Sequence, residues 1–372
     1  MDGVIRVKFS MLLMTLILVL TPLTNLPVDS GSLDNNVENN VSTKAQTTWN
    51  GLVQLTESYT VSVTDELLIS PCTTVELSTS SRLFVDGRLI IQGNNSCPVV
   101  FSQLGSGLHY GIQFNSSSSG RGSVIDNITI EDATYGITIY GSDPQLNNVT
   151  ITNPSRVGID LFSGANPVIH DLIINQAGKG FSYSDWRYGL GLSVGAGSTP
   201  VVERATMTDL RIRGLNIWGS SGGIYRDISI DNVSAEGANA ISAGVWIEDS
   251  QPLITNLSVD KSDYGILIRH VSDGGFTRAV VRDCIVTNSM YRGIYVDKSN
   301  HTNFTNYETA DFTNTIVRGT GGPNAKTAGI GFAAIEVNAT GAWFENTTVE
   351  DSTTVGVRLY FVDASTTFRN LT

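Results

Sequence analysis

Short runs of hydrophobic and polar residues alternate along most of the chain and recur in a fixed order. The run 127–130 (Asn-Ile-Thr-Ile) is followed by 136–139 (Gly-Ile-Thr-Ile), and the pair returns at 148–151 (Asn-Val-Thr-Ile) and 158–161 (Gly-Ile-Asp-Leu). Alternation of β-branched residues predicts strands, and the turn-forming residues between the runs predict corners. The strands of one unit cannot bury their own apolar face, so repeated units must stack.

The two-strand unit recurs as far as the C-terminus. First strands are predicted at 127–130, 148–151, 171–174, 204–207, 227–230, 256–259, 283–286, 314–317 and 346–349. Second strands are predicted at 136–139, 158–161, 189–192, 214–217, 244–247, 265–268, 293–296 and 356–359, with 334–337 as one choice for the remaining unit. Unit starts lie between 21 residues (Asn127 to Asn148) and 33 residues (Asp171 to Arg204) apart. Because the strand pattern is constant, the differences in length lie in loops.

An Asn or Asp follows the first strand in most units: Asp132, Asn153, Asn175, Asp209, Asp231, Asp260, Asn288 and Asp351. These residue types tolerate left-handed backbone, so we expect a corner whose side chains hydrogen-bond from coil to coil. An acidic stack also suits calcium, but no calcium-loop pattern (Asp-x-Asp/Asn-x-Asp/Asn-Gly) is present. We therefore expect neither a metal nor a cofactor.

Short strands, sharp corners and a constant register predict an all-β solenoid of parallel strands. A leucine-rich horseshoe would need its own Leu/Asn spacing, and a β-propeller needs about 40 residues per blade. Residues 370–372 begin a tenth unit and stop within its first strand. An open last coil would expose a strand edge and the core. We therefore expect the natural protein to extend beyond Thr372, into a cap, an anchor or another domain.

The N-terminal region has the features of an exported protein. Arg6 and Lys8 precede an apolar run over 9–20, which is shorter than the ~20 residues that span a bilayer. We expect a signal peptide over 1–30, with an uncleaved membrane anchor as the alternative because no clear cleavage site follows. A polar, Asn-rich flexible linker is expected over 31–48.

Residues 49–103 contain short, closely spaced strand signals with turn residues between them. A stacked core needs an atypical first unit, so we expect an N-terminal β cap here, before the main repeat over 104–372. Cys72 and Cys97 both fall in this module, and an exported chain can oxidise them to a disulfide. Cys284 occupies a core position of the repeat and is expected to be a buried hydrophobic residue, not a nucleophile.

The chain is acidic, with a formal net charge of −12. No basic stripe is present that would neutralise phosphates, so nucleic acid is excluded as a partner. Acidity of this size mainly favours solubility. A membrane contact is expected only through the N-terminal signal or a C-terminal anchor.

The repeat resembles a known family. The Asn-Ile-Thr-Ile and Gly-Ile-x-Ile units are similar to the right-handed parallel β-helix repeats of the pectate-lyase-like superfamily, over about residues 104–372. Segments 69–71, 83–87 and 98–102 resemble the stretch that precedes such repeats in many exported bacterial and archaeal proteins. The resemblance implies a right-handed parallel β-helix with an N-terminal β cap. It does not fix the function, because the superfamily includes lyases, hydrolases, epimerases and adhesins.

Enzymes of this superfamily usually work in a groove on the outer face of one sheet. In the second strand, the third residue points outward if its neighbours point inward. The expected outward row is Thr138, Asp160, Gly191, Asn216, Trp246, Leu267, Tyr295 and Arg358. Aromatic and polar side chains together suit a sugar, whose apolar ring face stacks while its hydroxyls hydrogen-bond.

The insertion over 181–188 holds the densest aromatic cluster and overhangs this row. We expect Asp185, Trp186 and Tyr188 to contact a ligand, with packing as a satellite core as the alternative. A glycosidase needs two carboxylates across the scissile bond, and Asp160 and Asp185 are the weak candidates. The paired-Asp and Gly-His-Gly patterns of polygalacturonase-like enzymes are absent, as is an Arg base with calcium-binding acids. We therefore favour a protein without catalytic residues.

Asn-x-Ser/Thr sequons are numerous: Asn40, Asn94, Asn115, Asn127, Asn148, Asn232, Asn256, Asn300, Asn303, Asn338, Asn346 and Asn370. Strand and turn chemistry already explains the sequons that coincide with the repeat motif, Asn127, Asn148, Asn256, Asn346 and Asn370. The loop sites Asn115, Asn300, Asn303 and Asn338 are the better candidates for a glycan.

Taken together, the sequence predicts a secreted or cell-surface β-helix protein that is non-catalytic and binds glycans or serves as an adhesin-like scaffold. The expected partner is a polysaccharide or surface glycan, bound by Asp160, Asp185, Trp186, Tyr188, Asn216, Trp246, Tyr295 and Arg358. One alternative is a polysaccharide lyase or glycoside hydrolase that acts on an extracellular polysaccharide. The other is a purely structural surface stalk.

Overall fold

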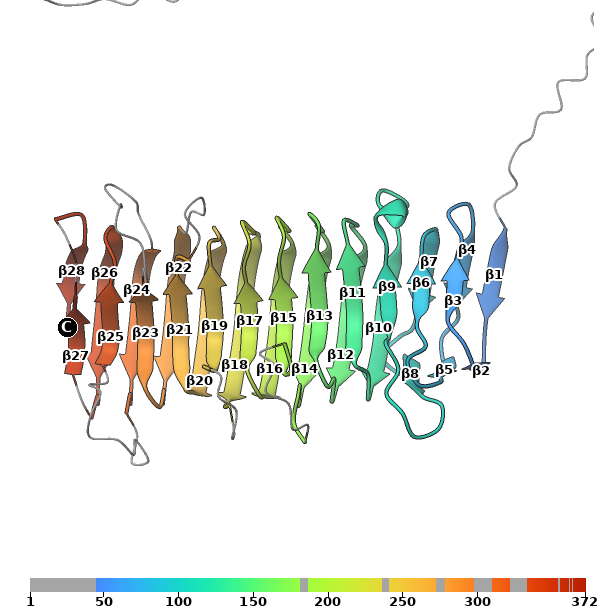
Figure 1. Ribbon diagram of the computed structural model, residues 1–372, viewed down its shortest axis with the longest axis horizontal. Helices are drawn as coiled ribbons and strands as arrows, with labels where there is room; N and C mark the ends of the chain where they lie inside the picture. Colours follow the sequence, from blue (N-terminus) through green and yellow to red (C-terminus); the bar gives the residue numbers. More distant parts are fainter. Residues whose placement is uncertain are drawn as a thin grey trace, which may run out of the picture. The chain divides into compact units, whose positions relative to one another are not determined.

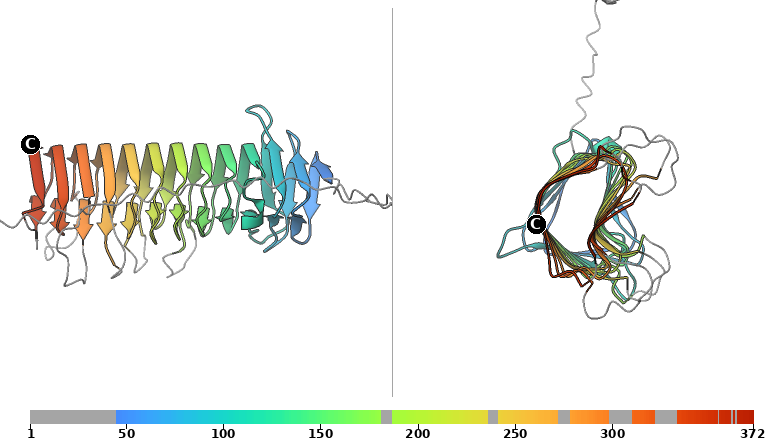
Figure 2. Two further views of the ribbon diagram at one scale, coloured as in Figure 1. Left: turned by 90° about the horizontal axis from the view of Figure 1, so that it is seen from above. Right: turned by 90° about the vertical axis from the view of Figure 1, so that its left-hand side faces the viewer.

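Two parallel β-sheets run side by side along a stack of coils, from β1 at one end to β28 at the other (Figure 1). The computed structural model describes residues 45–180, 187–235, 241–271, 278–297, 310–321, 333–353, 355–360, 362 and 364–372. These residues belong to one unit, Thr43–Thr372. Viewed along the axis, successive coils superpose and the two sheets face each other (Figure 2). The predicted right-handed parallel β-helix is confirmed.

In the repeat region each coil gives one strand to each sheet. The first sheet, sheet A, contains β10 (Val124–Glu131), β12 (Gln145–Thr152), β14 (Val168–Asn175), β16 (Val201–Leu210), β18 (Ile224–Val233), β20 (Leu253–Ser262), β22 (Ala279–Thr287), β24 (Ala310–Arg318), β26 (Ala342–Glu350) and β28 (Thr367–Leu371). The second, sheet B, contains β9 (Ile112–Phe114), β11 (Tyr135–Tyr140), β13 (Val157–Phe162), β15 (Leu190–Val194), β17 (Arg213–Ile217), β19 (Ala243–Glu248), β21 (Tyr264–Arg269), β23 (Arg292–Asp297), β25 (Ala333–Asn338) and β27 (Val355–Leu359).

The strands of sheet A are longer than the sequence pattern predicted, and each bends at one residue. The bend falls on the first residue of the repeat motif, which has a φ between 51° and 58°: Asn127, Asn148, Asp171, Arg204, Asp227, Asn256, Asp283, Asn314, Asn346 and Asn370. The sequence pattern placed this residue at the start of a strand. It is instead a left-handed corner between two halves of one strand, which explains why Asn and Asp dominate the position.

The N-terminal module is built from the same coil with that corner opened into a loop. Its strands in sheet A are β1 (Gln46–Trp49), β4 (Glu66–Ile69) and β7 (Arg88–Gln92), then β2 (Leu52–Leu55), β5 (Thr74–Leu77) and β8 (Val99–Gln103). β3 (Tyr59–Val61) and β6 (Leu83–Val85) extend sheet B. β10 pairs with β7 through its first half and with β8 through its second half. The role of the N-terminal module as a cap remains a prediction.

A disulfide joins Cys72 to Cys97 across the opened corners of two successive coils. Cys72 lies between β4 and β5, and Cys97 lies between β7 and β8. The disulfide therefore links neighbouring coils at the edge where later coils carry their left-handed residue. Strand β1 shows that regular structure begins within the predicted linker 31–48, because its β-branched residues pair with β4.

The core lies between the two sheets and is lined by the alternate residues that point inward. Ile137 and Ile139 are fully buried there. Cys284 is also fully buried, and burial raises the pKa of its thiol, as expected of a hydrophobic core residue. Near the C-terminal end, Phe312, Phe344 and Phe368 stack on one another with ring centroids 4.9 and 4.8 Å apart.

A second corner follows the strands of sheet A and carries hydrogen bonds from coil to coil. Nδ2 of Asn153 donates to Asp132 over 2.7 Å, and Nδ2 of Asn232 donates to Asp209 over 2.5 Å. In three coils the left-handed position was predicted one residue too early, at Asn175, Asp231 and Asp260. Gln176, Asn232 and Lys261 have the positive φ instead. In these coils, as in the others, the second left-handed residue lies five residues after the first.

The remaining described residues contain one short 3-10 helix, η1 (Ser116–Ser118). No helix in the described ranges is long and apolar enough to cross a membrane. The predicted signal peptide, most of the predicted linker, and the loop residues Asp185 and Trp186 lie outside the described residues.

Candidate functional site on the outer face of sheet B

The outward row predicted for the second strands lies on the outer face of sheet B. The strand register places one residue of each coil in this row: Phe84, Gln113, Thr138, Asp160, Ser193, Asn216, Trp246, Leu267, Tyr295, Glu336 and Arg358. Gly191 was assigned wrongly to the row, since Asp160 pairs with Ser193. Gly191 lies two residues before Ser193. A Cβ at Gly191 would lie only 2.6 Å from the carbonyl oxygen of Gly214, so this position requires a glycine.

A pocket of about 430 Å³ opens on this face around Asp160. Its lining residues come from coils that are distant in sequence: Arg82, Tyr135, Thr138, Tyr140, Val157, Asp160, Phe162, Arg187, Leu190, Ser193 and Trp218. Among the described residues of this lining, Asp160 is the one that was predicted to bind a ligand. The pocket combines a carboxyl group, hydroxyl groups, aromatic rings and two guanidinium groups.

Three aromatic rings form one wall of the pocket. The rings of Tyr140 and Phe162 are stacked, with centroids 5.3 Å apart and planes 17° apart. Trp218 meets Phe162 edge-on, with centroids 6.2 Å apart. Tyr140 and Phe162 end β11 and β13, and Trp218 directly follows β17. Rings that are open on one side offer a stacking surface for the apolar face of a sugar.

The aromatic residues were missed because only the third residue of each second strand was considered. Tyr140 and Phe162 come two residues after Thr138 and Asp160, so they point to the same side of the sheet. Trp218 lies two residues after Asn216 in the same way. The alternation of inward and outward side chains along each strand could therefore have identified these aromatic residues.

Asp160 is nearly buried, with 6% of its surface exposed. Burial raises the pKa of its carboxyl to about 7, although a hydrogen bond from Ser193 works in the opposite direction. At neutral pH the carboxyl is present in both protonation states. It can therefore donate a hydrogen bond as the acid or accept one as the carboxylate.

Arg82, the residue directly before β6, brings a cation to the same pocket. Its guanidinium lies 5.4 Å from the ring centroid of Phe84 and 4.8 Å from that of Tyr110, and it donates to Oε1 of Gln113. Burial lowers the pKa of the guanidinium, although it remains charged at neutral pH. Arg187, the second cation of the pocket, is exposed.

Tyr188 does not line the pocket but is held next to it. Its hydroxyl accepts a hydrogen bond of 2.5 Å from Nη2 of Arg156, and the hydroxyl of Tyr135 accepts one of 2.8 Å from Nη1. Arg156 also lies over the Tyr188 ring, 4.4 Å from its centroid. Arg156 thus fixes the end of the 181–188 insertion against β11 and positions Arg187 at the pocket.

Asn216 and Trp246 are in the predicted row but are closed to a ligand by their neighbours. Asn216 is fully buried and accepts a 2.6 Å hydrogen bond from Arg213. Trp246 is 3% exposed, and the guanidinium of Arg213 lies 3.6 Å from its ring centroid. Arg269 approaches the same ring at 5.3 Å. The ring face that we expected to hold a sugar is occupied by an arginine.

Tyr295 and Arg358 belong to a separate cluster near the C-terminal end of the face. Nε of Arg292 lies 3.0 Å from a carboxylate oxygen of Glu336, and Nη1 of Arg358 lies 3.4 Å from the same oxygen. Arg292 also lies 4.5 Å from the ring centroid of Tyr295. Glu336 is 4% exposed and forms ion pairs with both arginines. The predicted site residues therefore do not form one continuous groove.

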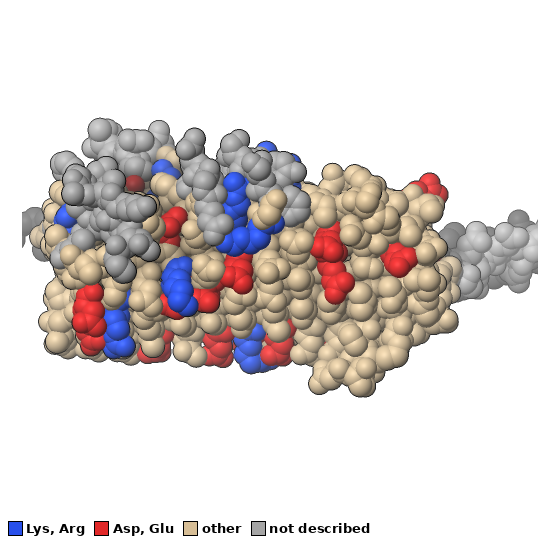
Figure 3. Space-filling view, turned by 90° about the horizontal axis from the view of Figure 1, so that it is seen from below, with Lys and Arg blue, Asp and Glu red and all other residues tan. Residues whose placement is uncertain are grey.

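Several charged groups elsewhere on the surface are also arranged in pairs. In Figure 3, Lys and Arg side chains lie beside Asp and Glu side chains. Examples are Arg226 with Glu203 at 2.7 Å and Arg318 with Glu350 at 2.6 Å. Within the described ranges, no three His, Cys, Asp or Glu residues are grouped so that they could hold a metal ion.

Comparisons with known proteins agree with the architecture. The family model described as the right-handed beta helix region matches residues 110–273 and 243–372. A comparison with curated protein sequences found no match. Among solved structures, an alginate lyase from Paenibacillus sp. is similar, with a TM-score of 0.50 and 12% identity over 84% of this chain and 99% of that chain.

Two further solved structures are similar at lower TM-scores. Endopolygalacturonase I from Stereum purpureum has a TM-score of 0.39 and 12% identity, over 89% of this chain and 95% of that chain. The catalytic unit of a GH87 alpha-1,3-glucanase from Streptomyces thermodiastaticus has a TM-score of 0.37 and 13% identity, over 88% of this chain and 70% of that chain. At these identities the likeness concerns the fold alone.

Proposed function

The chain belongs to the right-handed β-helix family, and we propose that it is an exported protein that binds glycans in the pocket around Asp160. The observation that carries the proposal is the aromatic wall of Tyr140, Phe162 and Trp218 beside a carboxyl group and hydroxyl groups. A sugar has an apolar ring face and a hydroxyl-bearing edge, and this pocket matches both. The signal-like N-terminus supports a secreted or cell-surface location as part of the proposal.

The polar groups of the pocket favour recognition of hydroxyl groups. Asp160, Ser193 and Thr138 lie in one row and are all nearly buried. A buried polar group that loses water must regain a hydrogen bond, so a ligand with well-placed hydroxyls is selected over one without them. A carboxyl with a pKa of about 7 can serve as donor or acceptor to such hydroxyls.

The number of carboxylic acids in the pocket favours binding of a glycan over its hydrolysis. Asp160 is the one carboxylic acid among the described residues that line the pocket. Hydrolysis of a glycosidic bond uses two carboxyl groups, about 5 to 10 Å apart. The second weak candidate, Asp185, lies outside the described residues.

A polysaccharide lyase is the second candidate, and the guanidinium groups of the pocket favour it. Elimination from a uronic acid needs a cation that stabilises charge developing on the substrate carboxylate, and a base that removes a proton. Arg82 and Arg187 provide cations and Asp160, with a pKa of about 7, provides a base. This chemistry would require Asp160 to reach the substrate carbon.

A glycan array combined with a depolymerisation assay separates the candidates. We expect the wild-type chain to retain one class of oligosaccharide and Phe162→Ala to lose it, without release of products from the parent polysaccharide. Unsaturated products that disappear in Asp160→Ala would replace the binding proposal with the lyase. Retention of no glycan by either protein would contradict both and favour a structural stalk.

A further inference from the structure

Most sequons in the described residues use their side-chain amide to hold the fold together. The Nδ2 atom donates a hydrogen bond in Asn115 (to Asp86), Asn127 (to Gly93), Asn232 (to Asp209), Asn256 (to Asp227), Asn338 (to Asp297), Asn346 (to Asn314) and Asn370 (to Asn346). Donor–acceptor distances are between 2.5 and 3.2 Å. Since Nδ2 is the atom to which an N-linked glycan attaches, these sequons are committed to packing. Asn115 and Asn338, expected from the sequence to be available, belong to this group.

Two sequons in the described ranges differ, Asn94 and Asn148. Both side chains are exposed, and Nδ2 donates no hydrogen bond within the described part of the chain. In Asn94 the side-chain oxygen accepts from the backbone N–H of Ser96 at 3.1 Å and from its hydroxyl at 2.8 Å. This Asx turn leaves the amide nitrogen of Asn94 facing solvent.

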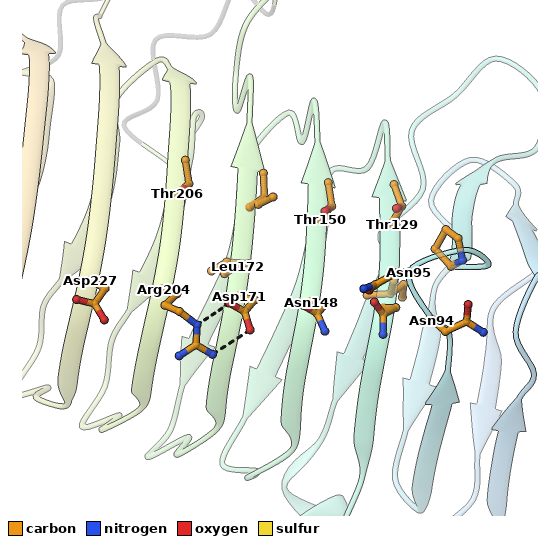
Figure 4. Close-up of a pocket in the computed structure, with 14 residues that line it drawn as sticks. Asn94, Asn95, Thr129, Asn148, Thr150, Asp171, Leu172, Arg204, Thr206 and Asp227 are labelled. Atoms are coloured by element: carbon orange, nitrogen blue, oxygen red, sulfur yellow. Dashed lines mark hydrogen bonds and ion pairs between the residues drawn. The ribbon is translucent and has the colours of Figure 1, made fainter.

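The ladder of left-handed residues is interrupted at Asn148 for a specific reason. On one side, Asn127 donates to the carbonyl of Gly93 in the opened corner of the preceding coil, away from Asn148. On the other side, Asp171 is held by a two-pronged ion pair with Arg204, at 2.6 and 2.9 Å (Figure 4). Asn148 is therefore left without a ladder partner in either direction.

The two available sequons lie on one groove of about 550 Å³ on the outer face of sheet A (Figure 4). Asn94 lines it from the loop between β7 and β8, and Asn148 from the corner of β12. Its floor carries Thr129, Thr150 and Thr206. A groove lined by hydroxyl and amide groups suits the first sugars of an attached glycan, which carry hydroxyls on their edges.

We propose that Asn94 and Asn148 are the sites of N-linked glycosylation in the described part of this chain, with the glycan seated on this groove. The co-substrate is a sugar activated by a phosphate leaving group, on either a lipid or a nucleotide. Nδ2 forms a bond to the anomeric carbon, the carbon–oxygen bond to phosphate breaks, and the phosphate leaves with that electron pair. One Nδ2 proton passes to solvent, so charge and atoms balance.

The test has two arms that separate the two donors. In the first, the full chain is secreted from a host that transfers lipid-linked oligosaccharides, and peptide mass spectrometry reads each sequon. In the second, the folded, unglycosylated chain is treated with an N-glucosyltransferase that uses a nucleotide sugar. Protease-generated peptides of the same chain are the control in which every sequon is accessible.

Matched variants remove single sequons without touching an asparagine. Ser96→Ala and Thr150→Ala each abolish a proposed site, whereas Ser258→Ala abolishes the sequon of Asn256, which is committed to Asp227. We expect the first two variants each to lose one glycan and Ser258→Ala to lose none. In the folded chain, occupancy at Asn148 should exceed that at Asn256 at least about fivefold, the factor that corresponds to one ordinary hydrogen bond.

Modification in one arm alone identifies the donor class and supports the proposal. Absence of sugar from Asn94 and Asn148 in both arms would overturn it. Occupancy of Asn256 equal to that of Asn148 in the folded chain would overturn it as well, since the hydrogen-bond ladder would then give no protection.

Discussion

The indole ring of Trp218 lies directly over Gly195. A Cβ on Gly195 would come within 2.4 Å of Cε2 and 2.7 Å of Nε1 of that ring. In the strand register Gly195 occupies the row position between Phe162 and Trp218, because Val194 pairs with both Leu161 and Ile217. The absent side chain lets Trp218 lean across one coil and meet the ring of Phe162. The aromatic wall of the pocket therefore depends on a glycine.

Replacing that glycine should move the tryptophan without unfolding the stack. In Gly195→Ala, the added methyl group displaces Trp218, and we expect glycan affinity to fall about tenfold through loss of one stacking contact. Gly356→Ala is the matched control, because a Cβ there meets Val349 at an ordinary 3.7 Å. Titration calorimetry measures the glycan affinity, and near-ultraviolet circular dichroism reports the displacement of Trp218. Equal affinity of Gly195→Ala and wild type would separate Trp218 from binding.

The raised pKa of Asp160 predicts a pH-dependent stability. The folded state keeps this proton up to a pH of about 7, whereas the unfolded chain releases it near its ordinary value of 3.8. The folded state therefore binds more protons between these values, and its stability falls as the pH rises through that window. The full cost, reached above pH 7, is as much as ~4 kcal/mol.

Asp160→Asn removes this cost. We expect the variant to match wild type at pH 4 and to be more stable than wild type at pH 8, as measured by denaturant unfolding midpoints. The difference between the two proteins, not either curve alone, isolates this group from other titrating residues. A variant that is destabilised equally at both pH values would show that the carboxyl is not held in an unfavourable charged state.

The left-handed corner of sheet A predicts that two substitutions at Asn256 lower the stability by different amounts. Its φ is 53°, and its Nδ2 donates to Asp227 at 2.6 Å. Asn256→Ala combines left-handed strain with loss of the hydrogen bond, and should lower the free energy of unfolding by about 2 kcal/mol. Asn256→Gly removes only the hydrogen bond and should lower it by about 1 kcal/mol. If alanine is no worse than glycine, the corner does not impose its conformation.

The Cys72–Cys97 disulfide should stabilise the N-terminal coils. It closes a loop with a sequence separation of 25 residues, for which the loss of unfolded-state entropy corresponds to about 3 kcal/mol. We expect the double variant Cys72→Ser/Cys97→Ser to exchange amide protons of β4 and β7 faster, and those of β20 at the wild-type rate, because coils contact mainly their neighbours. Uniformly faster exchange would indicate one cooperative unit instead.

Much of the fold could be predicted because the same pattern of strand and corner residues recurs in every coil. Runs such as 127–130 and 136–139 fix strand, corner and facing side in every coil, and errors in one unit are corrected by the next. The bend at Asn127 was missed because Asn before a strand also fits a strand start. Its left-handed role is visible only from the pairing on both sides of it.

The site was predicted less well because it depends on contacts between coils. The alternation that placed Asp160 outward also points Phe162 outward, but nothing local shows that Trp218 reaches it across Gly195. Trp246 has a suitable side chain in a suitable row, yet Arg213 covers its ring. Which aromatic ring is open and which is covered depends on side chains one coil away, beyond the period that a sequence pattern reports.

The glycan site on the outer face of sheet B is tested most directly by the affinity of one glycan, taken from the array, for three proteins. These are wild type, Phe162→Ala, and Ile285→Ala, whose exposed side chain lies on sheet A, away from the pocket. We predict that Phe162→Ala weakens binding at least about tenfold, while Ile285→Ala binds like wild type. Unchanged affinity in Phe162→Ala, or equal loss in both variants, would contradict a glycan site on the outer face of sheet B.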